Sequence, residues 1–264
     1  MTSISVITIN RNTGHEIDRT CASIRAQEHP FEWVVIDGGS TDRSVGVLRD
    51  HLRPGDIFVS EPDQGIADAF NKGLARCTGE AVIFLNAGDE FAGPDALGGL
   101  VRSWDRSRWR WVIGAGAVVD TSGRTLFTRR FRSPTVIDAF SLVRYNCQIL
   151  HQSVLAERSL FMDHGFFDVS FRLAMDYELW IRWISLGIAP QCSAHLVCRF
   201  HRGGASGDPR RNFQEDAMAR VKHSRRNPLF IELGLQFLAW VKTMIKGRYG
   251  RWLYRAKERC GLRF

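Results

Sequence analysis

The stretch FEWVVIDGGSTD, residues 31–42, runs from an apolar, β-branched segment into a turn of glycines and short polar residues. This composition predicts a strand that ends at Asp37 and is followed by a turn into a helix. Three other apolar runs in the first 90 residues also end at an Asn or Glu beside turn-forming residues. The four predicted strands are residues 5–10, 31–37, 56–61 and 81–86.

Segments with the apolar spacing of a helix lie between these strands, at residues 17–27, 44–51 and 66–77. Alternating strands and helices are typical of a mixed, mostly parallel, Rossmann-like α/β sheet flanked by helices. Such sheets bind ligands beyond the carboxyl ends of their strands. We therefore expect one cleft, lined by the polar residues that end the four strands: Asn10, Asp37, Glu61 and Asn86.

The second half of the sequence is less regular. Its IGAGAVV segment has Gly114 and Gly116 but Val119 at the third glycine position, so the dinucleotide-binding fingerprint is not met. A GxxxxGKS/T phosphate loop is also absent from the sequence, which removes the usual support for a kinase or a dehydrogenase. The predicted elements are a strand pair at 109–120 and 123–131, a helix at 176–187, and a strand at 192–201 that opens into a loop.

The composition fits one large α/β domain or one domain with an appendage, because 264 residues with 44% hydrophobic content can bury a sizeable core. The formal net charge of +8 is concentrated at the carboxyl end of the chain. Residues 242–264 contain eight basic residues and one acidic residue, a net charge of +7. The basic character therefore belongs to the tail and gives no reason to expect nucleic acid as a partner.

The six cysteines include no CxxC pair and no zinc-like spacing, so we interpret them as reduced, packed thiols. The amino terminus MTSISVITIN lacks the basic segment of a signal peptide, and no window reaches the ~18 uncharged apolar residues of a membrane span. These features predict a cytoplasmic protein.

The tail combines an apolar helical stripe with basic and aromatic residues, a composition typical of a helix on an anionic membrane surface. Packing on the domain's own core is the alternative, and a nucleic-acid contact has no motif to support it. We expect residues 1–227 to form the catalytic domain. Residues 228–264 would form a helical, basic extension that holds the protein peripherally on the inner face of the cytoplasmic membrane.

Three motifs in order, VVIDGGSTD, SEPDQGIADAFNKG and FLNAGDEF, resemble family 2 glycosyltransferases, which have the GT-A fold. The resemblance covers residues 3–207 and includes HQSV at 151–154, AMDYELWIRW at 174–183 and GGAS at 203–206. Within the family, the chain looks most like bacterial enzymes of exopolysaccharide assembly of the colanic acid type. The resemblance implies transfer of a hexose or deoxyhexose from a nucleotide-diphosphate sugar.

The donor site implied by this resemblance begins at the ends of the first strands. Thr8, Asn10 and Asp37 would line the nucleoside pocket, and Gly39 would allow close backbone approach. The alternative for DGGSTD is a simple strand-to-helix turn. Asp68 would be a further donor-site carboxylate, although a solvated amphipathic helix explains its pattern equally simply.

FLNAGDEF would be the metal site of the family, because a divalent cation held by oxygen ligands neutralises the leaving diphosphate. Asp89 matches the last acid of the family's acidic pair, but the preceding acid is missing, so Asn86, water or another segment would complete the site. We expect Mg²⁺ or Mn²⁺. Glu90 is interpreted as a helix-start or surface charge.

Asp176 in AMDYELW matches the family's general base, which accepts the proton of the acceptor hydroxyl as that hydroxyl attacks with inversion of the anomeric centre. The alternative is a helix N-cap. His151 and Gln152 resemble an acceptor-side element. Arg202 would contact the diphosphate, because a guanidinium pairs well with phosphate oxygens.

Together these features predict an inverting glycosyltransferase that acts on a glycan or a lipid-linked acceptor in surface or exopolysaccharide synthesis. A sugar nucleotidyltransferase is one alternative, but its glycine-rich loop with Arg or Lys is replaced after the first strand by INRNTGHE. A catalytically inactive glycan-binding or scaffold protein is the other, supported by the missing acid.

Overall fold

The computed structural model describes residues 2–131, 149–202 and 209–223. The chain divides into two compact units, Met1–Asp216 and Ala217–Phe264. The second unit contributes only the end of one helix to the described residues. The predicted boundary at 227/228, the basic extension and the GGAS loop therefore lie outside them.

Within the described residues, nine strands form one mixed sheet in the order β3-β2-β1-β4-β8-β6-β9-β5, with β7 paired to β6. The first four strands along the chain pair in parallel and make one half of this sheet. Nearly all side chains of the first, second and fourth strands are buried, on both faces of the sheet, as their apolar runs predict, whereas the third strand, at the edge of the sheet, is only partly buried. These strands are β1 (Ile4–Asn10), β2 (Glu32–Asp37), β3 (Ile57–Ser60) and β4 (Ala81–Phe84).

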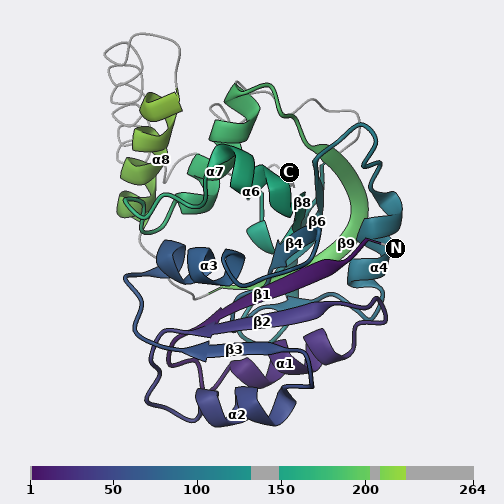
Figure 1. The fold of residues 1–264 in the computed structure, drawn as a ribbon, viewed down its shortest axis with the longest axis vertical. Coiled ribbons are helices and arrows are strands. Elements are labelled where there is room, and N and C mark those ends of the chain that lie inside the picture. Colours follow the sequence, from purple (N-terminus) through teal and green to yellow (C-terminus); the bar gives the residue numbers. More distant parts are fainter. Residues whose placement is uncertain (1, 132–148, 203–208, 224–264) are drawn as a thin grey trace, which may run out of the picture. The chain divides into compact units, whose positions relative to one another are not determined.

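The helices between these strands cover both faces of the sheet (Figure 1). Helix α1 (Ile17–Arg25) packs with Val6 and Val35 on one face, where α2 (Ser44–His51) also lies. Helix α3 (Ile66–Leu74) covers the opposite face, where Gly73 is so close to Ile7 that a Cβ atom would lie 2.5 Å from its Cγ2. The predicted α/β fold is confirmed.

Antiparallel and parallel pairs are mixed in the second half of the sheet. Strand β8 (Val154–Glu157) joins β4 to β6 (Trp111–Val119) in antiparallel register, whereas β9 (Gln191–His201) runs parallel to β6. The predicted strand pair is β6 with β7 (Thr125–Arg129), and the predicted helix is α7 (Met175–Ser185). Elements not predicted are β8 and, in addition, β5 (Glu90–Phe91), α4 (Ala96–Ser103), η1 (His151–Ser153), α6 (Arg158–His164) and α8 (Pro209–His223).

The IGAGAVV segment is a central, fully buried strand. A Cβ atom on Gly114 would lie 2.3 Å from Cγ2 of Val197, and one on Gly116 would lie 2.6 Å from Cδ1 of Leu150. These buried glycines therefore leave room for the side chains of Val197 and Leu150, a packing role and not that of a phosphate-binding loop. No helix among the described residues has the length and apolarity needed to cross a membrane.

Candidate active site

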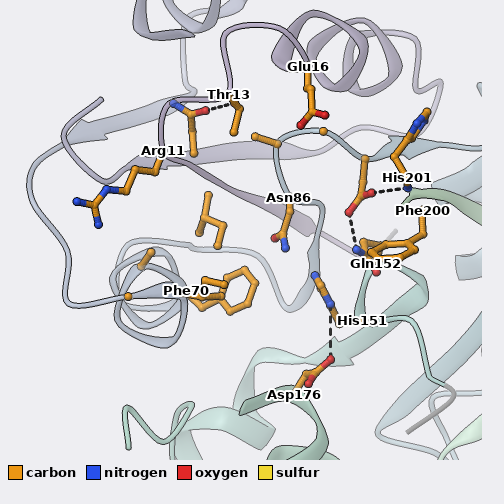
Figure 2. Close-up of a pocket in the computed structure, with 18 of the residues that line it drawn as sticks. Arg11, Thr13, Glu16, Phe70, Asn86, His151, Gln152, Asp176, Phe200 and His201 are labelled. Carbon is orange, nitrogen blue, oxygen red and sulfur yellow. Dashed lines mark hydrogen bonds and ion pairs between the residues drawn. The ribbon is translucent and has the colours of Figure 1, made fainter. Parts of the chain in front are cut away.

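A cleft of about 370 Å³ opens where β1 and β4 end. Its other walls come from α3, from η1, from the start of α7 and from the end of β9 (Figure 2). These elements are far apart in the sequence, and the sheet order brings them together because β4, β8, β6 and β9 are successive neighbours. Seven of the predicted site residues line the cleft: Asn10, Asn86, Asp89, His151, Gln152, Asp176 and Arg202.

Asp89 is the most deeply buried carboxylate in the cleft, with 6% of its surface exposed. Its Oδ1 accepts a hydrogen bond from the backbone N–H of His201 (2.9 Å), and its Oδ2 accepts one from Nε2 of Gln152 (2.5 Å). Burial raises the pKa of Asp89 to about 6, although these hydrogen bonds and the nearby imidazoles favour the ionised form. An ionised Asp89 would therefore gain from a cation in the cleft.

The turn that delivers Asp89 has a glycine for a steric reason. Gly88 has φ of +101°, and a Cβ atom there would lie 2.9 Å from Oε2 of Glu16. The hydroxyl of Thr20 accepts from the Gly88 N–H (2.9 Å) and donates to the carbonyl of Asp89 (2.7 Å). Helix α1 thus fixes the turn from behind.

His201 is held by a chain of polar contacts behind Asp89. Arg19 can only donate, so its bond to Nδ1 of His201 (2.8 Å) makes this nitrogen the acceptor. The proton is therefore on Nε2, which donates to Glu90 (2.7 Å). Glu90, interpreted from the sequence as a helix-start or surface charge, lies instead on β5 and pairs with Arg199 as well. This network fixes the backbone N–H that holds Asp89.

Three buried polar atoms in the cleft have no hydrogen-bond partner: Oδ1 of Asn86, Nε2 of His151 and Oε1 of Gln152. Figure 2 shows the side chains of Asn86 and His151 close together in the cleft, from the turn after β4 and from the neighbouring η1. Leaving such atoms unsatisfied costs free energy, so they favour a polar ligand or an ion. Carboxylate and amide oxygens suit Mg²⁺ or Mn²⁺, and the residues present therefore fit a divalent cation. The described part of the chain has no cluster of three His, Cys, Asp or Glu side chains that could hold one.

Asp176 lies in the first turn of α7, on the wall opposite the β4 turn. Its Oδ1 accepts from the N–H of Tyr177 (2.7 Å), and its Oδ2 lies 3.7 Å from Nδ1 of His151. The cap position of the helix is Ala174, so Asp176 is not the N-cap that the sequence allowed as an alternative. His151 and Gln152 are adjacent, and together they bridge Asp176 to Asp89.

Four predicted donor-site residues do not line the cleft: Thr8, Asp37, Gly39 and Asp68. Thr8 is in the core, where its hydroxyl accepts from Nε1 of Trp33 (2.9 Å). Asp68 accepts from the backbone N–H of Gln64 (3.0 Å) near the start of α3 and pairs with Lys72 (3.5 Å). Their donor contacts remain predictions.

Asp37 is completely buried, and both of its oxygens are engaged. Oδ1 accepts from Asn10 (2.7 Å) and from the hydroxyl of Ser40 (2.5 Å), and Oδ2 accepts from Ser60 (2.6 Å) and from the Ser40 N–H (3.0 Å). Burial alone would raise its pKa, but these hydrogen bonds outweigh burial and hold the pKa below its ordinary value. Gly39 completes this turn with φ of +77°.

Asp63 is a cleft residue to which the sequence analysis gave no role. Its carboxylate accepts from the Gly65 N–H (2.9 Å), lies 3.8 Å from Arg11, and covers Gly38, where a Cβ atom would meet it at 2.1 Å. The signal for it was present, because Asp63 lies inside the motif SEPDQG. The motif alone did not reveal that Asp63 reaches the cleft while Asp37 stays behind the turn.

A family model described as glycosyl transferase family 2 matches residues 3–166. An uncharacterized glycosyltransferase of Mycobacterium tuberculosis is 32% identical over 209 residues, which are 76% of each chain. A PGL/p-HBAD biosynthesis glycosyltransferase of Mycobacterium bovis is 29% identical over 160 residues, 59% of each chain.

Two solved structures share the fold at low sequence identity. S. aureus TarS 1–349 in complex with UDP-GlcNAc has a TM-score of 0.65 at 17% identity, over 89% of this chain and 71% of that one. The mannosyltransferase PcManGT of Pyrobaculum calidifontis, in complex with GDP-Man and Mn²⁺, has a TM-score of 0.56 at 21% identity, over 83% of this chain and 61% of that one.

Proposed function

The chain belongs to glycosyl transferase family 2, and from this premise we propose that it is an inverting enzyme that uses a nucleotide-diphosphate sugar and a divalent cation. The single observation that carries this proposal is that Asp89 and Asp176 lie on two walls of one cleft. Gln152 contacts Asp89, and the adjacent His151 contacts Asp176. The transferred sugar would lie between the two carboxylates.

At the donor end, Asp89 would hold the cation with the amide oxygens of Asn86 and Gln152. Both amide oxygens are buried and lack a hydrogen-bond partner, which supports this assignment. The cation, when bound, neutralises the charge of the departing diphosphate. Arg202 lines the cleft at the end of β9 and would add a positive charge beside the same phosphate groups.

At the acceptor end, Asp176 would accept the proton from the attacking hydroxyl. A base on the wall opposite the leaving group matches an in-line attack, and such an attack inverts the anomeric centre. His151 would act as a binding group in this step, because its Nε2 is buried in the cleft without a partner and can hydrogen-bond the acceptor hydroxyl or the sugar.

The nucleoside would contact the rim formed by Asn10, Arg11 and Asp63, the polar residues that line the cleft near the end of β1. TarS is in complex with UDP-GlcNAc and PcManGT with GDP-Man, so UDP-sugars and GDP-mannose are the first donors to test here. The predicted contacts of Thr8, Asp37, Gly39 and Asp68 would be indirect, through the turns that support this rim.

The direct test is nucleotide release from UDP-glucose, UDP-GlcNAc and GDP-mannose, with and without Mn²⁺ or Mg²⁺. We expect cation-dependent release of UDP or GDP from one donor class, and loss of this release in Asp176→Asn while the same nucleotide still binds. Pyrophosphate formation from a nucleoside triphosphate and a sugar phosphate would instead identify a nucleotidyltransferase. Binding without turnover on any donor and acceptor panel would favour a glycan-binding or scaffold protein.

The acceptor would be a glycan on a lipid carrier at the inner face of the cytoplasmic membrane, in surface or exopolysaccharide synthesis. The composition of residues 228–264 supports this part of the proposal, because basic residues near an anionic surface add about 1 kcal/mol each. Removal of residues 228–264 is expected to move the protein from the membrane fraction to the soluble fraction. An unchanged distribution would reject membrane attachment through this segment and leave the catalytic proposal intact.

A further inference from the structure

Helix α7, which carries Asp176, begins without a local cap. The residue at its cap position is Ala174, whose methyl side chain accepts no hydrogen bond, and the side chain of Asp176 bonds the N–H of Tyr177 further along the first turn. The first N–H groups of a helix have no partner inside the helix and need one elsewhere when they are buried. Ala174 is 4% exposed, so water has little access to this helix end.

Glu215 of α8 holds the segment that leads into this helix end, including the cap residue Ala174, from more than 40 residues away. Its Oε2 accepts from three consecutive backbone N–H groups: those of Arg172 (2.9 Å), Leu173 (2.7 Å) and Ala174 (2.9 Å). Glu215 is itself buried, with 8% of its surface exposed. A buried carboxylate is costly unless it is well paired, and three N–H donors at a positive helix end provide such pairing.

The segment held by Glu215 is also a wall of the cleft. Leu173 and Met175 line it on either side of Ala174, and Asp176 is the next residue. The backbone geometry that Glu215 imposes on residues 172–174 therefore sets where α7 begins. The start of α7 in turn sets the position of Asp176 beside His151.

The geometry points to Glu215 as a positioning residue for the Asp176 carboxylate. Glu215 does not line the cleft; it acts through the backbone of residues 172–174. The inference rests on the proposed role of Asp176 as the general base. It adds that α8, which follows β9 and Arg202 in the chain, helps to assemble the acceptor side of the site.

The first test needs no substrate. Amide hydrogen exchange of the full-length protein is compared with that of Glu215→Ala and Gln214→Ala, the latter changing the exposed neighbour in the same helix. We expect faster exchange at residues 172–178 in Glu215→Ala and no change there in Gln214→Ala. Unchanged exchange in Glu215→Ala would overturn the inference.

The second test measures turnover with the donor found by nucleotide release. Glu215→Ala is expected to lower kcat about 100-fold, since small displacements of a catalytic group have effects of this size. Glu215→Gln keeps an oxygen acceptor without the charge. It should therefore preserve most of the backbone geometry at residues 172–174 and reduce kcat about tenfold or less. The Kd for UDP or GDP with Mn²⁺ should be unchanged in both variants.

A double variant separates positioning from general stabilisation. If Glu215 acts through Asp176, then Asp176→Asn with Glu215→Gln is no slower than Asp176→Asn alone. Additive losses, or a weakened Kd for the nucleotide, would overturn the inference and leave the proposed function standing. If Asp176→Asn alone keeps full turnover, the proposed base itself is wrong, a result distinct from the failure of Glu215 variants.

Discussion

Asp37 ends β2 and Asp89 follows β4, the two strands that flank β1 in the sheet, yet the two carboxylates differ in hydrogen bonding and in the direction of their pKa shifts. Asp37 accepts four hydrogen bonds, and its pKa is held below the ordinary value. Asp89 accepts two on its carboxylate, and burial raises its pKa to about 6. Three buried polar side-chain atoms without a hydrogen-bond partner lie in the cleft with Asp89, and among the described residues none belongs to Asp37 or to a side chain bonded to it.

We propose that this difference separates a carboxylate that supports the site, Asp37, from one that a ligand can approach, Asp89. Asp37 ties together Asn10, Ser40 and Ser60, three residues from two strands and a turn. Asp89 is fixed in place but keeps unsatisfied oxygens beside it, on Asn86 and Gln152. The capacity for new interactions, and not burial alone, distinguishes the two positions.

The largest expected effect comes from exchanging each carboxylate for an amide. Asp89→Asn should lower transfer by about 1,000-fold, because the cation and the leaving diphosphate lose their charged partner. Asp37→Asn should keep most of its turnover, since its oxygen can still accept from Ser40 and Ser60. Nucleotide release measures both variants. Equal losses in the two would remove the functional distinction between them.

The next effect is on stability and concerns Asp37. Asp37→Ala leaves the amide of Asn10 and the hydroxyls of Ser40 and Ser60 without their acceptor, at a cost of about 3 kcal/mol. Chemical denaturation of Asp37→Ala and the parent protein measures this difference. The control is Asp18→Ala, which removes an exposed carboxylate. If Asp37→Ala lowered the free energy of unfolding no more than Asp18→Ala, the four hydrogen bonds would contribute little to stability.

Parts of this comparison can be predicted from the sequence and parts cannot. Strand endings with Asn10, Asp37 and Asn86 follow from apolar runs and turn residues, which are local signals. The carboxylate of Asp37 is held in its own turn by Ser40, three residues later, and also by Asn10 and Ser60, which are 27 and 23 residues away. A local pattern therefore contains only part of this arrangement.

The residues on the acceptor side of the cleft could be predicted even less well from local sequence patterns. His151, Gln152 and Asp176 were identified through the family resemblance, and the structure places all three in the cleft. Glu215 had no signal, because its partners are 41 to 43 residues away and are backbone groups, which carry no residue-specific code. Long-range contacts of this kind are visible only in the fold.

A smaller effect is expected at Gln152, the side chain that touches Asp89 from the acceptor wall. Gln152→Ala removes both a donor to Oδ2 and an unpartnered oxygen. We expect the Mn²⁺ concentration for half-maximal activity to rise about tenfold, as for other residues that orient a metal ligand. Titration of Mn²⁺ at saturating donor measures this. The matched control is Ser153→Ala, the adjacent buried residue, whose hydroxyl bonds the carbonyl of Leu150 and not Asp89.

The smallest effect is a difference in pH dependence between the two carboxylates in the ligand-free protein. The pKa of Asp37 in the folded state lies below its ordinary value of about 3.9, so the unfolded state binds a proton more readily. The stability that Asp37 contributes is therefore present above about pH 4 and is lost as the pH falls through the folded-state pKa. Asp89 has the opposite sign. Its protonated form is favoured in the folded state, so its contribution is greatest below its unfolded pKa and is lost as the pH rises toward about 6.

Above pH 6 and without added cation, the ionised and buried Asp89 therefore destabilises the folded protein. Asp89→Asn should raise the free energy of unfolding by about 1 kcal/mol at pH 7.5, while it lowers transfer by about 1,000-fold. The gain should shrink as the pH is lowered toward 4, where the native carboxyl is itself neutral. Denaturation of both proteins across this range, without added cation, measures the effect. A gain that is independent of pH would mean that the amide stabilises the cleft by packing, and that Asp89 does not carry an unfavourable charge there.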